Sequence, residues 1–275
     1  MQTTVGIFDS GVGGLTVAAA VHRLLPALPI RYIADTAFFP YGERPAEDVE
    51  ARSHALTRRL IDEGCALVVV ACNTASSAAL ELLRSQFTVP IVGMEPPLKP
   101  AAERTRSGRV AVLVTPGTAR GERLARLREN YAGDAEVAVI PMPGLADLVE
   151  AGEVSGARID AALREAIASL ATAGAPPVDE IALGCTHYGF LRPALEALLG
   201  PGVEVLDAAD AVARRVRHQL ETFGHAVPAG ASAVVHAAAT GDASAFAVTI
   251  ERLRAAGAAL PPIEFAQPML QEASA

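Results

Sequence analysis

Short apolar runs alternate along the chain with longer segments in which Ala, Leu and Arg recur at helical spacing. Such runs are typical of strands buried on both faces, and helices between them allow the strands to run parallel. The pattern therefore predicts an α/β fold with mostly parallel sheets. The predicted strands are Val5–Phe8, Arg31–Ala34, Leu67–Ala71, Ile91–Val92, Val110–Val114, Val137–Ile140, Glu180–Leu183 and Val203–Leu206. The predicted helices are Leu15–Leu25, Ala46–Glu63, Ser76–Arg84, Gly121–Tyr131, Arg158–Thr172, Arg192–Leu199 and Ala208–Phe223.

The alternation of strands and helices is interrupted at two places along the chain. Three prolines within Glu95–Pro100 are expected to stop regular structure, and a second change falls near Leu206–Ala209. We therefore expect two similar doubly wound domains with the active site in the cleft between them. Residues 1–96 and 208–266 would form a discontinuous first domain, residues 97–207 a second domain, and residues 267–275 a frayed tail.

Two segments share one arrangement, in which a strand is followed by a cysteine, polar residues and a helix. They are Val68–Thr74, which contains Cys72, and Glu180–His187, which contains Cys185. The carboxyl ends of strands are where α/β sheets bind ligands. The repeated arrangement therefore predicts two half-sites that face a common cleft.

The thiol of Cys72 precedes a helix that Asn73, Thr74 or Ser76 could cap. Helix N–H groups favour the thiolate, so we expect a thiol pKa lowered toward neutrality. The alternative is a small buried core residue, which is how most free cysteines behave. The polar neighbours favour function, because a core cysteine needs no amide and hydroxyl beside it. Cys65 has no polar partners in the sequence and is interpreted as structural.

Cys185 has a similar setting and is followed by Thr186 and His187. An imidazole beside a thiol can relay protons or stabilise the charge of the thiolate, although a lone histidine can also be structural. A thiol hydrolase would need one cysteine and one base, which leaves the second cysteine unexplained. Thiolate and imidazole are also zinc ligands, so a zinc or small-ligand binding protein that uses Cys72, Cys185 and His187 is a non-enzymatic alternative.

The segment Gly6–Leu15 is a strand, a glycine-rich turn and the start of a helix. A dinucleotide site is one interpretation, with Asp35 as the acid that would bind ribose. It fails in detail, because the third glycine is missing and Asp9 would put a carboxylate where the pyrophosphate should lie. We expect instead a turn whose backbone amides approach a carboxylate, with Asp9 and Ser10 as polar groups. A helix cap is the alternative role for Asp9.

Two further segments offer polar groups near strand ends. Tyr41 and Gly42 follow the second predicted strand and its loop, and Thr115 and Thr118 lie at the carboxyl edge of a strand in the middle of the chain. Each signal is as consistent with an ordinary turn or helix cap as with a binding site.

Composition narrows the possible partners. The 275 residues carry a net charge of −8 and no basic cluster interleaved with aromatic residues, so nucleic acid is not an expected partner. No apolar run reaches the roughly 18 residues of a membrane helix, and the N-terminus has no secretion signal. We therefore expect a cytoplasmic protein with no membrane partner. The three cysteines are an odd number, which favours reduced thiols.

Four segments carry a family resemblance. They are Phe8–Thr16, Asp35–Thr36 with Pro40–Gly42, Ala71–Ala75 and Gly184–Tyr188. In this order they resemble the signature segments of the glutamate racemase family, within the aspartate/glutamate racemase superfamily, and the similarity runs from residue 5 to about residue 255. The chain departs from the family pattern at Gly189, where a proline is common, and at Asp207–Ala209, which lacks a serine often found after the aspartate. Both departures concern helix starts rather than thiols.

The resemblance implies a homodimer that interconverts L- and D-glutamate without cofactor or metal and supplies D-glutamate for bacterial peptidoglycan. It implies that Cys72 deprotonates the D-isomer and Cys185 the L-isomer. By the same resemblance Asp9, His187 and Glu150 assist the thiols. The implied substrate-binding residues are Asp9, Ser10, Tyr41, Gly42, Asn73, Thr74, Thr186 and His187, and the strand-edge residues Thr115 and Thr118 are added as candidates.

The chemistry of racemisation suits two opposed thiols, because a proton must leave one face of the α-carbon and another must arrive on the opposite face. Two alternatives stay open at this point. A racemase dependent on pyridoxal phosphate would need Lys99, the only lysine, which lies between Leu98 and Pro100. Aspartate racemase is the nearest rival within the superfamily, because the sequence does not give the length of the pocket.

Overall fold

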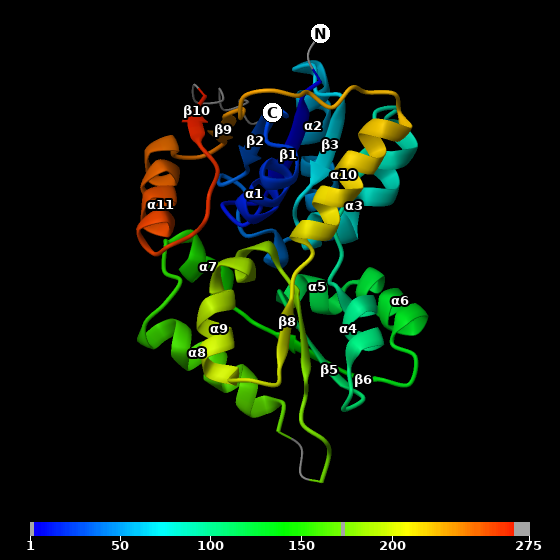
Figure 1. Cartoon of the computed structure of the whole chain (residues 1–275), viewed down its shortest axis with the longest axis vertical. Coiled ribbons are helices and arrows are strands. Elements are labelled where there is room, and N and C mark those ends of the chain that lie inside the picture. Colours follow the sequence, from blue (N-terminus) through cyan, green and yellow to red (C-terminus); the bar gives the residue numbers. More distant parts are fainter. Residues whose placement is uncertain (1–2, 172–173, 267–275) are drawn as a thin grey trace.

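Two parallel β-sheets form the framework of the molecule (Figure 1). The computed structural model describes residues 3–171 and 174–266. The first sheet has the strand order β10-β9-β2-β1-β3-β4 and the second has the order β6-β5-β7-β8, with parallel pairing between neighbouring strands throughout. The first sheet contains β1 (Val5–Asp9), β2 (Ile30–Ala34), β3 (Leu67–Val70), β4 (Ile91–Val92), β9 (Val235–Ala239) and β10 (Ile263–Phe265). The second sheet contains β5 (Arg109–Val114), β6 (Glu136–Pro141), β7 (Glu180–Gly184) and β8 (Glu204–Leu206).

Helices cover both faces of the first sheet. Because side chains alternate along a strand, Ile7 packs into the core on one face and its neighbour Phe8 into a separate core on the other. The helices on the Ile7 side are α1 (Leu15–Leu24), α10 (Ala209–Thr222) and α11 (Ala243–Ala255), and those on the Phe8 side are α2 (Ala46–Asp62) and α3 (Asn73–Gln86). This arrangement is that of a doubly wound sheet.

The second sheet is built in the same way. Val112 packs into a core on one face and Leu113 into the core on the other. The helices on the Val112 side are α4 (Leu98–Arg104) and α6 (Glu122–Tyr131), those on the Leu113 side are α7 (Leu145–Glu150), α8 (Ala157–Ser169) and α9 (Arg192–Leu199), and α5 (Pro116–Arg120) follows β5 directly. Short 3-10 helices occur at Tyr41–Glu43 and Thr186–Leu191.

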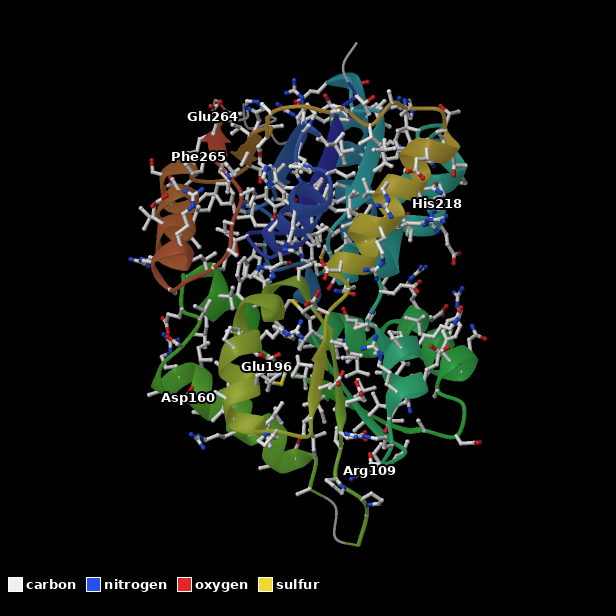
Figure 2. All side chains as sticks on the ribbon, viewed as in Figure 1. Arg109, Asp160, Glu196, His218, Glu264 and Phe265 are labelled. Carbon is white, nitrogen blue, oxygen red and sulfur yellow. The ribbon has the colours of Figure 1, made fainter. Side chains whose placement is uncertain are left out.

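The amino ends of the strands of the second sheet point away from the first sheet. Arg109 marks this end at the start of β5 (Figure 2). Its guanidinium donates to the carbonyl oxygen of Pro176 over 2.7 Å and binds the carboxylate of Glu136 over 3.1 Å. The carboxyl ends of the strands therefore face the first sheet, and the residues that follow them are free to form a site.

The predicted α/β class with parallel sheets is confirmed. All eight predicted strands exist, each within one residue of the predicted ends, and all seven predicted helices exist. The largest differences are at α3, which starts three residues earlier than predicted, and at α8, which ends at Ser169 rather than at Thr172, a residue outside the described ranges. Four helices and two strands were not predicted, namely α4, α5, α7, α11, β9 and β10.

The prolines near residue 96 were expected to stop regular structure, and this was wrong in part. Helix α4 begins at Leu98 and contains Pro100 in its first turn. A proline is tolerated there, because the first backbone N–H groups of a helix have no intrahelical partner. Within the described residues no helix is long and apolar enough to cross a membrane.

Candidate active site

Cys72 and Cys185 line one pocket between the carboxyl ends of the two sheets. Cys72 follows β3 and Cys185 follows β7. Both residues are buried, with exposed fractions of 6% for Cys72 and 8% for Cys185. The pocket encloses about 500 Å³, including its mouth. The other predicted site residues that line it are Ser10, Tyr41, Gly42, Asn73, Thr74, Thr115, Thr186 and His187.

The thiol of Cys72 differs from the prediction in its protonation. Burial and the nearby charge of Asp9 raise the pKa of Cys72 well above its ordinary value, and the backbone N–H of Ala75 lowers it only in part. The expected capping side chain is also missing, since Cys72 occupies the N-cap position of α3 and no side-chain hydrogen bond caps this helix. Ser76 donates instead to the carbonyl oxygen of Val70 over 3.1 Å. The resting Cys72 is therefore a neutral thiol.

Cys65 lies outside this pocket, among the side chains between the first sheet and α2. Burial raises the pKa of its thiol to about 12. It is 4% exposed and packs as a small apolar residue. The geometry supports its interpretation as structural.

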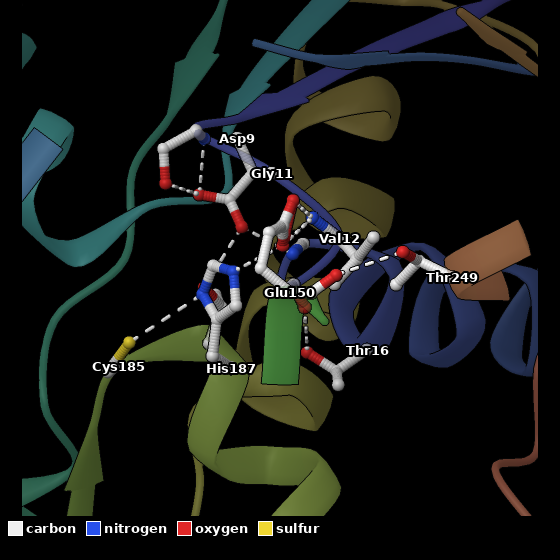
Figure 3. A network of polar contacts seen from close by, with 12 residues as sticks. Asp9, Gly11, Val12, Thr16, Glu150, Cys185, His187 and Thr249 are labelled. Carbon is white, nitrogen blue, oxygen red and sulfur yellow. Dashed lines mark hydrogen bonds and ion pairs between the residues drawn. The ribbon is translucent and has the colours of Figure 1, made fainter. Parts of the chain in front are cut away.

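Cys185 is part of a buried chain of polar contacts (Figure 3). Its Sγ lies 3.8 Å from Nδ1 of His187, and Nε2 of His187 lies 3.0 Å from Oε2 of Glu150. Burial opposes a charge on His187, but hydrogen bonds to Cys185 and Glu150, together with their negative charges, outweigh it and raise the pKa of His187 well above its ordinary value. A protonated His187 stabilises negative charge on the sulfur beside it.

Asp9 lies behind the pocket wall and is fully buried. Its carboxylate accepts hydrogen bonds from the N–H groups of Ser10 (2.7 Å) and Gly14 (2.5 Å) and from the hydroxyl of Thr186 (3.0 Å). Burial raises the pKa of Asp9, although the charge of His187 and these hydrogen bonds oppose the rise. Asp9 therefore faces both halves of the site.

The glycine-rich turn was expected to direct its amides at a carboxylate, and the carboxylates it binds belong to the protein. The N–H of Val12 donates to both carboxylate oxygens of Glu150, at 3.1 and 3.0 Å, and the N–H of Gly14 donates to Asp9. The alternative role of Asp9 as a helix cap is wrong, since Gly14 is the N-cap residue of α1 and no side chain caps this helix. Glu150 reaches this turn from α7, across the molecule (Figure 3).

Three threonine hydroxyls meet beside the pocket and join its two halves. Oγ1 of Thr74, at the start of α3, lies 3.2 Å from Oγ1 of both Thr115 and Thr118, which belong to the second half. Thr115 also caps α5 by accepting from the N–H of Thr118. Thr115 lines the pocket, whereas Thr118 lies behind it. Thr115 therefore both lines the pocket and caps α5.

Asn73 lines the pocket with a buried side-chain amide that has no hydrogen-bond partner among the described residues. It is 4% exposed, and neither its Nδ2 nor its Oδ1 has a hydrogen-bond partner among the described residues. Buried polar atoms without partners are rare in folded proteins. A ligand with both donors and acceptors would satisfy this amide.

Sequence reasoning missed part of the pocket lining: Phe39, Pro40, Glu43, Pro116, Met142, Gly144, Ala146, Asp147 and Gly184. Met142 follows the predicted strand Val137–Ile140, so the rule that ligands bind at the carboxyl ends of strands could have identified it. Asp147 belongs to α7, a helix of six residues that is too short to predict from periodicity.

The positions of the residues do not favour the two competing interpretations, a pyridoxal phosphate enzyme that uses Lys99 and a zinc protein. Lys99 lies on α4 with a 58% exposed side chain 3.9 Å from Glu103, and it does not line the pocket. Among the described residues, no group of three or more His, Cys, Asp or Glu side chains is arranged to hold a metal ion.

Comparison with known proteins decides the family. A family model described as Asp/Glu/Hydantoin racemase matches residues 14–216. The chain belongs to the Asp/Glu/Hydantoin racemase family. It is 45% identical to the glutamate racemase of Roseiflexus sp. (strain RS-1) over 251 residues, which cover 90% of this chain and 91% of that protein. It is 42% identical to the glutamate racemase of Herpetosiphon aurantiacus over 243 residues, which cover 88% of this chain and 94% of that protein.

The fold of this racemase-family chain is shared with solved structures. The crystal structure of Escherichia coli glutamate racemase in complex with L-glutamate and activator UDP-MurNAc-ala aligns with a TM-score of 0.82 and 32% identity over 96% of this chain and 98% of that one. These similarities confirm the predicted family and the predicted enzyme class, an isomerase that racemises an amino acid, and they support glutamate as the amino acid.

Proposed function

We propose that Cys72 and Cys185 are the two acid/base groups that interconvert L- and D-glutamate in this pocket, without a cofactor. The observation that carries the proposal is the shared pocket: each thiol follows the carboxyl end of a strand from a different sheet, and both line the same small cavity. A ligand held between them would present opposite faces of its α-carbon to the two sulfur atoms. Glutamate is supported by the family and by relatives that carry its name.

In the direction from L- to D-glutamate, the thiolate of Cys185 takes the α-proton and becomes a thiol. The thiol of Cys72 gives its proton to the opposite face of the α-carbon and becomes a thiolate. The reverse reaction exchanges these roles, so Cys72 is the base for the D-isomer. The resting charges fit this assignment, because a protonated His187 lies beside Cys185 and the pKa of Cys72 is raised.

His187, Glu150 and Asp9 would assist the two thiols. Glu150 and His187 form a relay to Cys185, with distances of 3.0 and 3.8 Å between the joined atoms. Asp9 interacts with Cys72 by a hydrogen bond and is bound to Thr186 on the other half of the site. Charge can therefore be balanced whichever thiol is ionised.

The polar residues of the lining would bind the substrate and stabilise the charge that develops on its α-carboxylate. Asn73 is the strongest candidate, because its buried amide lacks protein partners. Ser10, Thr74 and Thr186 lie in the same lining, and Tyr41, Gly42 and Thr115 offer further contacts. Thr118 would act through its contacts with Thr74 and Thr115.

We extend the proposal to the setting of the enzyme. The chain would act as a cytoplasmic homodimer and supply D-glutamate for peptidoglycan. Its domains would be residues 1–96 with 208–266 and residues 97–207, a division supported by the membership of β9 in the first sheet and of β5–β8 in the second. The proposed tail, residues 267–275, lies outside the described residues.

The decisive experiment is incubation of L-glutamate in deuterated water, with optical rotation and α-deuteration followed together. We expect the parent to approach the racemate and to place deuterium on the inverted product. Cys72→Ser and Cys185→Ser should each lose activity by roughly 100-fold or more, the scale of a lost acid/base group. Cys65→Ala is the matched control and should keep the parental rate. Near-parental activity in either serine variant would overturn the two-thiol mechanism, and faster turnover of aspartate than of glutamate would overturn the substrate.

A further inference from the structure

Helix α11 packs against the first sheet. Its buried face carries Phe246, Ile250 and Leu253, which join the core beside the first sheet. Asp242 caps the helix by accepting hydrogen bonds from the N–H groups of Ser244 (2.8 Å) and Ala245 (3.1 Å). The position of α11 is therefore fixed by the first sheet and not by the active-site pocket, which it does not line.

Two donors of α11 reach the carboxyl end of α7. The hydroxyl of Thr249, which is 8% exposed, donates to the carbonyl oxygen of Glu150 over 2.9 Å. A guanidinium N–H of Arg252 donates to the carbonyl oxygen of Ala151, also over 2.9 Å. The last carbonyls of a helix have no partner within it, so α11 supplies the partners that α7 lacks.

The turn after α7 also packs tightly on α11. Gly152 has a φ of +80° there, and a Cβ atom at this position would lie 2.7 Å from Cβ of Arg252. The backbone of Glu150 is thus held from one side by hydrogen bonds and close packing. Its carboxylate extends the other way, to the N–H of Val12 and to His187 (Figure 3).

We propose that Thr249 and Arg252 are positioning residues for the Cys185 half of the site, acting through Glu150. By fixing the backbone of Glu150 they keep its carboxylate on Nε2 of His187, and His187 in turn keeps its charge beside Cys185. The inference rests on the proposed role of Cys185 as an acid/base group. It assigns an active-site task to a helix that contributes nothing to the pocket lining.

The titratable groups that face His187 come from three elements. They are Cys185 after β7, Glu150 on α7 and Asp9 on β1, while Glu43 and Asp147 lie elsewhere around the same pocket. Of these contacts, only that of Glu150 depends on α11. Loosening Glu150 should therefore lower the pKa of His187 without a direct change at Cys185 or Asp9.

Thr249→Val tests the proposal, because valine keeps the shape of threonine and removes its hydroxyl. The readout is the titration of the His187 ring by nitrogen NMR, with the signal assigned by its loss in His187→Gln. We expect the midpoint of Thr249→Val to lie about half a pH unit or more below that of the parent. Thr249→Ser, which keeps the hydroxyl, should restore the parental midpoint, and Glu150→Gln should give the largest downward shift.

Thr222→Val is the matched control. Its hydroxyl bonds to the carbonyl oxygen of His218 within α10, so this variant loses a helical hydroxyl without touching α7. It should leave the His187 titration unchanged. Arg252→Met keeps the aliphatic stem that packs on Gly152 and loses the donor, and it carries the same test if Thr249→Val does not fold.

Kinetics provides the second readout. At pH values above the lowered midpoint of the His187 titration, kcat/KM of Thr249→Val should be roughly 3- to 10-fold below that of the parent. This is the scale of one lost hydrogen bond. The fall should be equal for both enantiomers, because they have equal free energies. An unchanged midpoint in both Thr249→Val and Arg252→Met, or an equal shift in Thr222→Val, would overturn the positioning role. A parent without racemase activity would overturn the proposed function instead, since the titration does not depend on turnover.

Discussion

The hydroxyl of Tyr41 donates a 2.6 Å hydrogen bond to Oδ2 of Asp35, a carboxylate that is fully buried behind the pocket wall. Arg52 binds the same carboxylate through Nε (2.8 Å) and Nη2 (2.7 Å), and Thr240 donates to its Oδ1 over 2.6 Å. Thr240 follows β9, so this cluster connects the pocket wall to a strand far along the chain. The position of a pocket-lining tyrosine therefore depends on an ion pair outside the pocket.

Asp35→Asn should weaken both the fold and substrate binding. The change removes the charge that Arg52 pairs with, and Arg52 is only 26% exposed, so we expect the free energy of unfolding to fall by roughly 2 to 4 kcal/mol. Tyr41→Phe, which removes one hydrogen bond, should cost about 1 kcal/mol. Urea denaturation measures both values, and initial rates should give a raised KM for glutamate. An Asp35→Asn protein with parental stability would contradict the role of the cluster.

Gly13→Ala should damage the site more than the fold. A Cβ atom at residue 13 would lie 2.4 Å from Nδ1 of His187 and 2.5 Å from Oγ1 of Thr186, so both side chains would have to move. A displacement of about 1 Å can cost roughly 100-fold in rate. We expect a loss of that order in kcat/KM, measured with glutamate, together with a small change in the unfolding midpoint.

Gly189→Ala serves as the control for this prediction. The added Cβ would lie 3.2 Å from Cγ2 of Thr16, a tight contact with a side chain that does not line the pocket. Activity should stay within about threefold of the parent, since a surface of apolar atoms can give way by a few tenths of an ångström. Equal losses in Gly13→Ala and Gly189→Ala would show that crowding anywhere near α1 is sufficient, and the specific role of His187 and Thr186 would then be wrong.

The sequence predicted the sheets well because their strands are short, apolar and bounded by turn residues. Strand β9 was missed for a physical reason. Its sequence from Val235 to Ala239 is mostly alanine, which favours a helix locally, and it becomes a strand only because it pairs with β2 inside the first sheet. Tertiary context decided this element.

The candidate site was predictable where one local pattern carried the signal. Cys72 and Cys185 each follow a strand and precede a helical turn, and both line the pocket. The thiol pKa of Cys72 was not predictable, because its direction depends on burial and on Asp9, neither of which a local pattern reveals. The contact of Glu150 with Val12 joins residues far apart in the chain and appears only in the folded molecule.

Asp179 should contribute to stability at neutral pH and lose that contribution in acid. Its carboxylate accepts hydrogen bonds from the hydroxyls of Thr105 and Ser107 and from the N–H groups of Arg106 and Ser107. Burial opposes its charge, but these hydrogen bonds outweigh burial and lower the pKa of Asp179 below its ordinary value of 3.8.

A lowered pKa in the folded state means that the stabilisation is present above pH 3.8 and is lost as the pH falls through the lowered value. Asp179→Asn should therefore be less stable than the parent near pH 7, and the difference should narrow in acid. Unfolding free energies from urea titrations at several pH values measure this. A difference that stays constant with pH would mean that the hydrogen bonds hold a neutral group equally well.

His187 should give the opposite pH dependence. Burial opposes its charge, yet Cys185 and Glu150 raise its pKa well above 6.5 in the folded protein. The folded state therefore binds a proton more tightly than the unfolded chain, so this stabilisation is complete below pH 6.5 and is lost as the pH rises through the raised pKa. The parent should lose unfolding free energy over that window, and His187→Gln should lose less. Thermal unfolding from pH 6 to pH 9 measures the two slopes. Parallel slopes would mean that the ring is neutral in the folded protein, and the charge it is proposed to place beside Cys185 would be absent.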